Sequence, residues 1–357
     1  MPATHVSILE ELRAHLGEWY PELAGDVVVD VVDQDPRVRS QLMRVRVTSG
    51  GAFRRTIIVK HAPDEPVVVD DRPRLVAPME PTERLTQEFE ALRLVADRFA
   101  DGDDPGLGAV RPLGILPETH ALAMEAYAGR PLHETLIPGL IRQTSELRAT
   151  RLVERAGHWL HAFHDLPADD RPVRQGSRAE IAEAFHAVGR FLTAQGAPAD
   201  IAAVAETGAR AVTRLADPLP IALCHGDFAP RNILIDQTGR VAVIDISVRW
   251  RAPVYEDLAS LLVALRMSRA NALTRGYVFG PAVGRLEPAF LHGYFDGAPI
   301  PRAAIRVYEL LLVLDKWAAR VSRTSDRPGR RRLPDRAIDD HFASSSRLLA
   351  RRLTRIG

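Results

Sequence analysis

Lysine is scarce in this chain, which has only Lys60 and Lys316 among its 357 residues, although Lys and Arg together number 47. Arginine therefore supplies the bulk positive charge, and a lysine at a defined place in the pattern carries more information than usual. Cysteine is scarcer still, because Cys224 is the single one and no intrachain disulfide can form. A reducing compartment suits such a chain, and the apolar surroundings of Cys224 favour a buried structural thiol over a nucleophile.

Long apolar runs are also missing. No window reaches the ~18 consecutive apolar residues that indicate a transmembrane helix. The N-terminal residues 1–11 lack the basic start and apolar block of a secretory signal, so we expect a cytoplasmic protein. The hydrophobic and charged fractions, 46% and 26%, are those of an ordinary globular protein. The length indicates about two domains.

What the sequence does have is a group of oxygen-bearing side chains at informative spacings. Asp227 and Asn232 stand five residues apart, ahead of a short apolar strand. After a turn at Asp236–Gly239, a second apolar strand carries Asp245, so a hairpin brings the three side chains together. Phosphoryl transfer from ATP needs a carboxylate to orient and deprotonate the attacking hydroxyl, and oxygen ligands for magnesium. Asp227 suits the first role, while Asn232 and Asp245 suit the second; turn capping by the two aspartates is the alternative.

The ordered set of His225, Asp227, Asn232 and Asp245 resembles the catalytic loop and metal-binding strand of the protein-kinase-like fold. More narrowly, the motif resembles that of the aminoglycoside phosphotransferase and choline kinase superfamily. Protein kinases usually carry Arg at the position of Gly226 and Lys at the position of Ala229. These two differences favour a small-molecule kinase.

The resemblance implies a bilobed α+β protein-kinase-like fold, with a small antiparallel sheet lobe and a larger, mainly helical lobe. An N-terminal nucleotide-binding lobe is expected at residues 1–122, and a C-terminal catalytic and acceptor-binding lobe at residues 123–357. The resemblance also implies ATP and Mg²⁺ as cofactors, with Asp227 as the catalytic base and Asn232 and Asp245 as metal ligands.

The N-terminal pattern suits such a lobe. An accessory helix is expected over residues 5–20, and strands rich in branched residues over 27–32, 42–47 and 57–61. The loop between the first two strands covers the ATP phosphates in kinase-like folds, and here it contains no glycine. Its Arg37, Arg39 and Ser40 either contact phosphates through their side chains or form a solvated turn, and neither interpretation is favoured.

Lys60, at the end of the third strand, resembles the kinase lysine that binds the α- and β-phosphates. Its carboxylate partner is expected on a helix over residues 81–95, where apolar residues recur at helical spacing. Glu88 matches the position of that partner, and Glu90 is the near alternative. A solvated face is the other interpretation of a helical glutamate.

Two further strands, over residues 111–115 and 120–124, lead into the expected hinge between the lobes. Met124, Glu125 and Tyr127 are the candidate adenine contacts in that hinge. Backbone polar groups make such contacts, so the identity of these side chains is only loosely constrained.

Beyond the hinge the pattern is helical, over residues 152–164, 179–192 and 200–215. The first of these helices carries His158, His161 and His164. Metal ligation is one hypothesis for them, but positions i, i+3 and i+6 spread around a helix, which favours structural histidines. Asp257 matches a recurrent aspartate of the superfamily at the start of the next helix, where we expect it to support the catalytic loop.

The C-terminal segment 320–357 is strongly basic, with eleven Arg and four Asp, a balance of +7 in a chain whose net charge is +1. A solvated basic helix is one interpretation. The other is that Arg330–Arg332 and a helix over residues 338–353 attract an anion, such as a phosphorylated sugar, a nucleic acid backbone or an anionic membrane surface.

We therefore expect an ATP- and magnesium-dependent O-phosphotransferase that acts on a hydroxyl of a small molecule, such as a sugar or another metabolite. The alternative is a phosphotransferase for aminoglycoside-type antibiotics, whose cationic substrates would require a carboxylate-lined pocket. A non-catalytic nucleotide-binding scaffold is less favoured, because it would have no need of Asp227. No nucleic acid partner is expected.

Overall fold

The computed structural model describes residues 3–23, 25–36, 41–50, 53–61, 73, 80–100, 104–136, 146–167, 171–246, 250–268, 271, 280–325 and 333–355. The chain forms two compact units. Unit 1 comprises Met1–Val68, Pro78–Gly129 and Leu234–Val248, and unit 2 comprises Val69–Ala77, Arg130–Ile233 and Arg249–Gly357. The division expected at residue 122 therefore falls inside unit 1, which also includes a hairpin from the C-terminal half of the sequence.

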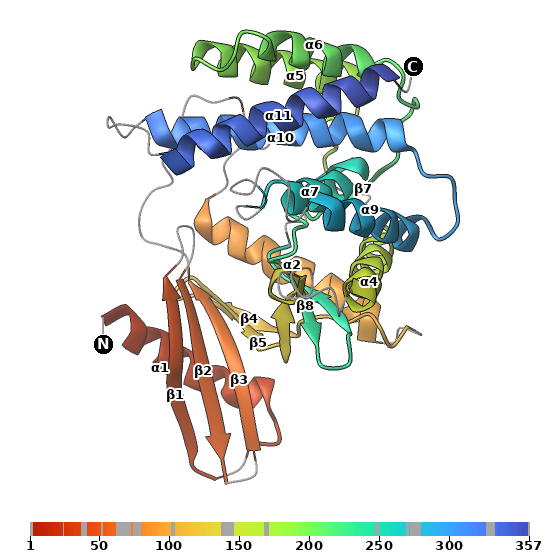
Figure 1. The fold of residues 1–357 in the computed structure, drawn as a ribbon. Coiled ribbons are helices and arrows are strands. Elements are labelled where there is room, and N and C mark those ends of the chain that lie inside the picture. Colours follow the sequence, from red (N-terminus) through yellow and green to blue (C-terminus); the bar gives the residue numbers. More distant parts are fainter. Residues whose placement is uncertain are drawn as a thin grey trace. The chain divides into compact units, whose positions relative to one another are not determined.

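Unit 1 is built on a five-stranded antiparallel sheet (Figure 1). The strands are β1 (Val27–Pro36), β2 (Gln41–Ser49), β3 (Phe53–His61), β4 (Pro112–Leu116) and β5 (Ala121–Glu125), in the order β1-β2-β3-β5-β4. Burial alternates along β2, because successive side chains of a strand point to opposite faces. The strands expected from branched residues all lie within these bounds.

Helix α1 (Ala3–Trp19) is part of the core of unit 1 rather than an accessory element. Its buried Ile8, Leu12 and Leu16 belong to one hydrophobic cluster with the inward residues of the sheet, among them Val45 and Val59. The helical spacing of these three residues was visible in the sequence, but their packing partners were not.

Helix α2 (Pro81–Ala100) packs against β4 and β5. Val59 belongs to the cluster with α1, so its neighbour Lys60 must point to the opposite face of β3. A hairpin made of β8 (Ile233–Asp236) and β9 (Val241–Val243) forms a second sheet with β6 (Gly129–Pro131). The side chain of Asp236 accepts hydrogen bonds from the backbone N–H groups of Thr238 and Arg240 at 2.8 and 2.9 Å, which fixes the expected turn.

Unit 2 is mainly helical, as expected. Its helices are α4 (Glu146–His164), α5 (Arg178–Ala194), α6 (Ile201–Val212), α7 (Tyr255–Arg266), α9 (Gly280–Phe295), α10 (Arg302–Ser325) and α11 (Leu333–Arg355). A short antiparallel pair joins β7 (Ile221–Leu223) to β10 (Arg251–Pro253). Helix α10 packs on α7, α11 and α5, and α11 also packs on α6, as Figure 1 shows.

Glycines allow α4 and α9 to approach each other closely. A Cβ on Gly293 would lie 2.0 Å from the carbonyl oxygen of Glu154, and one on Gly157 would lie 2.3 Å from that of Phe290. Both obstacles are backbone atoms, which cannot rotate away. The crossing therefore requires glycine at both positions.

A buried ionic network ties three helices of unit 2 together. Arg266 of α7 pairs with Glu287 of α9 and with Glu309 of α10, the latter at 3.0 Å, and Arg306 of α10 pairs with both glutamates. Each carboxylate thus has at least two guanidinium partners, and Glu287 has a third in Arg302, at 3.8 Å. Such pairing is what makes burial of these charges tolerable.

The basic C-terminal segment forms a packed helix in its described part. Leu349 and Leu353 of α11 are buried, whereas Leu348 is 50% exposed. Arg347 forms two hydrogen bonds to Asp200, at 2.6 and 2.8 Å. Arg330–Arg332 lie outside the described residues.

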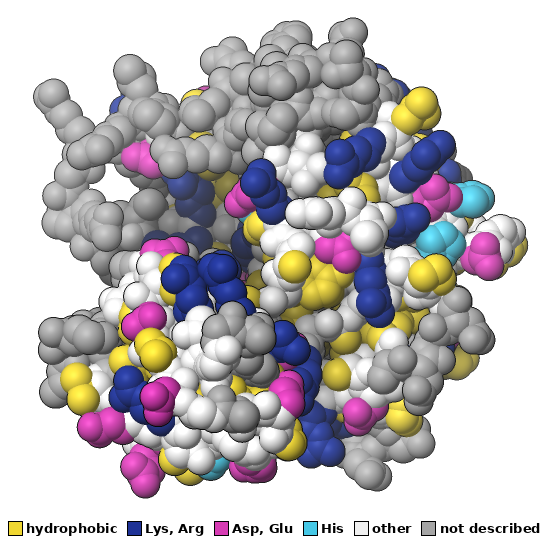
Figure 2. All heavy atoms as spheres, turned by 90° about the horizontal axis from the view of Figure 1, so that it is seen from below, with side chains coloured by type: hydrophobic (Ala, Val, Ile, Leu, Met, Phe, Trp, Pro, Cys, Tyr) yellow, Lys and Arg dark blue, Asp and Glu magenta, His cyan; other side chains and the backbone are white. Residues whose placement is uncertain are grey.

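Charges of both signs are interspersed over the face of the molecule in Figure 2. Among the described residues, no helix is long and apolar enough to cross a bilayer.

Candidate functional site

The first group of candidate site residues lies in unit 1 around Lys60. Its ammonium nitrogen lies 2.6 Å from Glu88 Oε2 and also forms an ion pair with Asp245 Oδ1. The Lys60 and Glu88 side chains are only 4% and 3% exposed. Glu90 is exposed, so the helical register of α2 aims Glu88, and not the near alternative, at the lysine.

Two opposing effects act on the ionisation of Lys60. Burial lowers the pKa of an ammonium group, but the carboxylates of Glu88 and Asp245 outweigh it, so the pKa of Lys60 is raised above its ordinary value. Lys60 is therefore a fixed, buried cation. A cation of this kind can bind the oxygens of a phosphate chain.

Asp245 has an unusual backbone conformation. Its φ is 59°, in the left-handed region that residues other than glycine rarely adopt. Such conformations cost free energy and persist where the surrounding structure holds them, commonly at functional positions. Here the ion pair with Lys60 holds the side chain, at the point where the chain leaves β9.

The second group lies in unit 2, in the loop of Asp227 and Asn232, which is the candidate catalytic loop. Asn232 is buried, and its Nδ2 donates to the backbone carbonyl of Asp227 at 2.9 Å and to Asp227 Oδ2 at 3.3 Å. Both partners are acceptors, so the amide nitrogen must face them. The Oδ1 atom of Asn232 then points the other way, where it can serve as an oxygen ligand.

Asp257 supports this loop from α7. Its carboxylate accepts hydrogen bonds from the backbone N–H groups of His225, at 2.6 Å, and Gly226, at 2.9 Å. His225 Nδ1 in turn accepts the N–H of Asp227 at 3.2 Å. These hydrogen bonds confirm the expected support of the loop by Asp257. The N-cap residue of α7 is Val254, which makes no side-chain cap.

Asp257 is itself held by His164 of α4. Its Oδ2 lies 3.2 Å from His164 Nε2, and His164 Nδ1 lies 2.7 Å from the hydroxyl of Tyr294. Burial raises the pKa of Asp257, but the hydrogen bond and charge of His164, together with His225, lower it below its ordinary value. Asp257 is therefore ionised. Its buried carboxylate joins α7 to α4 and to the loop of His225, and Tyr294 of α9 is joined to it through His164.

Only one of the three helical histidines is part of this network. His164 is buried, whereas His161 is exposed and pairs with Asp165 at 3.7 Å. Among the described residues, His164, Cys224 and Asp257 form the one group close enough to hold a metal ion, with ligand atoms within 4.8 Å of one another. Burial raises the pKa of the Cys224 thiol, and its sulfur lies 3.5 Å from the carbonyl of Ala252. The thiol is thus protonated and structural, and metal ligation by the histidines is not favoured.

The hinge candidates have structural side-chain contacts. Met124 is buried, and Glu125 pairs with Arg111 at 3.0 Å. The hydroxyl of Tyr127 reaches the β8–β9 hairpin, 3.3 Å from the carbonyl of Arg240. Burial, with the nearby Asp236 carboxylate, raises the pKa of Tyr127 to about 12. The side chain of Tyr127 thus contacts the β8–β9 hairpin, which precedes Asp245 in the chain. Adenine binding through the backbone of the hinge stays a prediction.

Arg39 and Ser40, two of the predicted site residues, lie outside the described residues, as does Arg37.

Arg231 was not among the predicted site residues, and it forms an ion pair with Asp227 Oδ2. Its position four residues after Asp227, and its charge, were the available signals.

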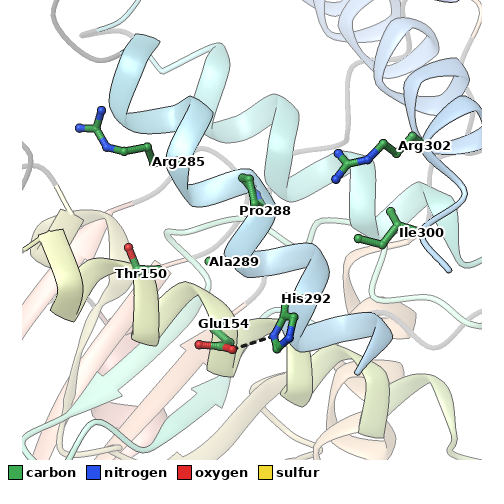
Figure 3. A pocket seen from close by; sticks show the side chains of 8 residues that line it. All are labelled: Thr150, Glu154, Arg285, Pro288, Ala289, His292, Ile300 and Arg302. Atoms are coloured by element: carbon green, nitrogen blue, oxygen red, sulfur yellow. Dashed lines mark hydrogen bonds and ion pairs between the residues drawn. The ribbon is translucent and has the colours of Figure 1, made fainter. Parts of the chain in front are cut away.

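The described part of unit 2 also has an open hollow of about 480 Å³ between α4, α9 and the start of α10 (Figure 3). The pair of Glu154 and His292, 2.9 Å apart, lies in it, and Arg285 and Arg302 flank it. None of the predicted site residues lines this hollow. We therefore do not take it as the active site.

A sheet unit with a buried lysine–glutamate pair, and a helical unit with an Asp/Asn catalytic loop, define the bilobed protein-kinase-like class. The chain belongs to the phosphotransferase enzyme family, whose sequence profile matches residues 44–337. No curated protein matches the sequence significantly.

Solved structures agree on the fold. A putative aminoglycoside phosphotransferase from Ralstonia eutropha JMP134 is 15% identical, with a TM-score of 0.63 over 96% of this chain and 98% of that one. A choline/ethanolamine kinase family protein from Mesorhizobium loti is 17% identical, with a TM-score of 0.50 over 96% and 94%. Spectinomycin phosphotransferase, solved with ADP and spectinomycin, is 13% identical, with a TM-score of 0.52 over 96% and 97%.

Proposed function

We propose that this chain transfers the γ-phosphate of ATP to a hydroxyl of a small molecule, such as a sugar or another metabolite, with the help of Mg²⁺. The observation that carries the proposal is the buried Lys60 in contact with both Glu88 and Asp245. A buried cation beside a carboxylate at the end of a strand suits the binding of a nucleotide phosphate chain together with its metal ion.

The residues suit both cofactors. Lys60 supplies a permanent positive charge for the α- and β-phosphates, and Glu88 holds it in place. Asn232 Oδ1 and the carboxylate of Asp245 are the oxygen donors that Mg²⁺ prefers. When bound, the ion would neutralise charge on the phosphates.

Asp227 is the proposed base. Its carboxylate would align the acceptor hydroxyl and take its proton as the hydroxyl oxygen attacks the γ-phosphorus. Its backbone is fixed from both sides, because Asp227 N–H bonds His225 Nδ1 and its carbonyl accepts from Asn232. Such preorganisation is what a positioned base requires.

An antibiotic phosphotransferase is the second candidate. Spectinomycin phosphotransferase, solved with ADP and spectinomycin, and an aminoglycoside phosphotransferase solved with ADP and hygromycin B have the same fold, but at 13% and 14% identity they support the fold alone. The basic C-terminal segment argues against a polycationic acceptor, although Arg347 is compensated by Asp200 and adds little to that argument. We therefore still prefer a neutral or anionic small-molecule acceptor, but the charge of the C-terminal segment supports this preference less strongly than the sequence alone suggested.

The test is a screen of ADP release with ATP and Mg²⁺ against pooled sugars, amino alcohols, nucleosides and aminoglycosides. Each positive pool is repeated with Asp227→Asn, which must abolish acceptor-dependent release. Turnover with a neutral or anionic hydroxyl compound supports the first candidate. Turnover restricted to aminoglycosides supports the second, and no turnover in any pool, together with no MgATP binding by calorimetry, contradicts both.

A further inference from the structure

Arg231 contacts the proposed base directly. Its guanidinium donates to Asp227 Oδ2, the same oxygen that receives the weaker hydrogen bond from Asn232 Nδ2 at 3.3 Å. Within the described residues, no hydrogen bond reaches Asp227 Oδ1. One oxygen of the carboxylate is thus held by two donors, while the other is left to accept a proton.

The burial of the loop explains why Arg231 is the residue that can do this. Phe228, Ala229, Pro230 and Asn232 are buried. Arg231 and Asp227, in contrast, have side chains that are 55% and 40% exposed. Arg231 is therefore the one residue among the five after Asp227 whose side chain shares the accessible face of the loop with the carboxylate.

Ala229 occupies the position at which protein kinases usually carry a lysine. Alanine has no charge, and Ala229 is 1% exposed, so this position presents no cation to the reacting groups. Arg231, two residues later in the same loop, places a positive charge next to the Asp227 carboxylate.

We propose that Arg231 is a positioning residue for phosphoryl transfer, an inference that rests on the proposed function. It holds Asp227 by Oδ2, so that Oδ1 faces the acceptor hydroxyl. In the reaction the hydroxyl proton passes to Oδ1, the acceptor oxygen forms a bond to the γ-phosphorus, and the bond from that phosphorus to the β,γ-bridging oxygen breaks as ADP leaves. Arg231 gains and loses no proton in this step.

The ion pair also bears on the class of acceptor. A bare carboxylate would attract a cationic substrate, whereas the Asp227–Arg231 pair has no net charge. The base therefore offers a polycationic acceptor no electrostatic advantage, and neutral or anionic hydroxyl compounds suit it better.

The test compares Arg231→Ala and Arg231→Lys with Arg210→Ala. Arg210 is a matched control, because it forms an exposed ion pair with Glu206 at the same i, i+4 spacing, at 3.5 Å, on α6. Exposed pairs of this kind contribute little to stability, so all three variants should fold and melt as the wild type does. With the acceptor found in the screen, Arg231→Ala should lower kcat on the order of 10- to 100-fold, with the KM for ATP changed less than about twofold.

Guanidinium chloride at low millimolar concentration should restore part of the kcat of Arg231→Ala, and Arg231→Lys should be intermediate. Wild-type kcat in Arg231→Ala, or a loss that lies mainly in the KM for ATP, would overturn the proposal. The Arg210→Ala variant should match the wild type in every measurement.

A crystal structure of Arg231→Ala tests, independently of turnover, whether Arg231 positions the Asp227 carboxylate. The Asp227 carboxylate should adopt a different rotamer, or more than one. An unchanged carboxylate with its Asn232 contact intact would show that Arg231 does not position it. If the wild type turns over no acceptor, the proposed function fails, and this comparison still tests the contact.

Discussion

At the scale of single residues, Asp227 and its immediate partners carry the proposed chemistry. Asp227→Asn should lower kcat by ~10² to 10⁴ while the affinity for ATP stays nearly unchanged, because the base meets the acceptor and not the nucleotide. Steady-state kinetics with the acceptor from the screen, together with calorimetric titration of MgATP, measure the two quantities. Wild-type turnover in this variant would exclude Asp227 as the base.

Lys60 and Glu88 should act as one unit, because they lie 2.6 Å apart and are both buried. Lys60→Ala and Glu88→Ala should each reduce kcat/KM for ATP, and the double variant should lose much less than the sum of the two free-energy changes. Glu90→Ala, on the exposed side of the same helix, is the control and should have no effect. Additive losses would mean that the pair does not function as a unit.

Asp257 links the stability of unit 2 to pH. Its pKa is lower in the folded protein than in the unfolded chain, so its stabilising contribution is fully present above the unfolded value of about 3.9 and is lost as pH falls through the folded value. Asp257→Asn should cost about 3 kcal/mol at neutral pH, since it leaves His225 N–H or Gly226 N–H without its acceptor. Chemical denaturation from neutral pH down to about pH 2 covers the range in which this contribution is lost, and the variant should show a flatter pH dependence below about pH 4. If the free energy of unfolding depended on pH equally in the variant and the wild type, groups other than Asp257 would be responsible for the acid sensitivity.

At the scale of elements, the crossing of α4 and α9 depends on glycine. Gly293→Ala should destabilise the protein by about 1–3 kcal/mol, because its Cβ would overlap the carbonyl oxygen of Glu154 at 2.0 Å and two helix backbones would have to move apart. Gly284→Ala, on the same helix with nothing within 4 Å, is the matched control and should stabilise by up to about 1 kcal/mol. Thermal and denaturant unfolding of both variants give the comparison. Equal effects would show that the helices are not in close contact.

At the scale of the whole molecule, charge is nearly balanced in total but concentrated at the C-terminal end. Replacing Arg330, Arg331 and Arg332 by Gln should raise the KM for an anionic acceptor or weaken binding to anionic vesicles, and both effects should fade with added salt. Arg347→Gln is the control, since Asp200 already compensates that charge. If the triple variant behaves as the wild type at low ionic strength, the segment is a solvated surface.

Features that depend on neighbours along the chain could be predicted before the structure was known. The spacing of Asp227 and Asn232 placed both on one loop, and the Asp236–Gly239 turn predicted the β8–β9 hairpin. Branched residues predicted the first three strands. These features are local, so propensity and spacing are sufficient to predict them.

The choice between residues of the same type could be made only from the folded structure. The sequence predicted Glu88 as the partner of Lys60 but left Glu90 as a near alternative, and it did not distinguish among His158, His161 and His164. The choice depends on which side of a helix meets another element, and therefore on packing between segments far apart in the chain. The same reason explains why the hydroxyl of Tyr127, expected near the nucleotide, contacts the β8–β9 hairpin. The ion pair of Arg231 with Asp227 is local by contrast, and it depends on which side chains of the loop are left exposed once Phe228, Ala229 and Pro230 are buried.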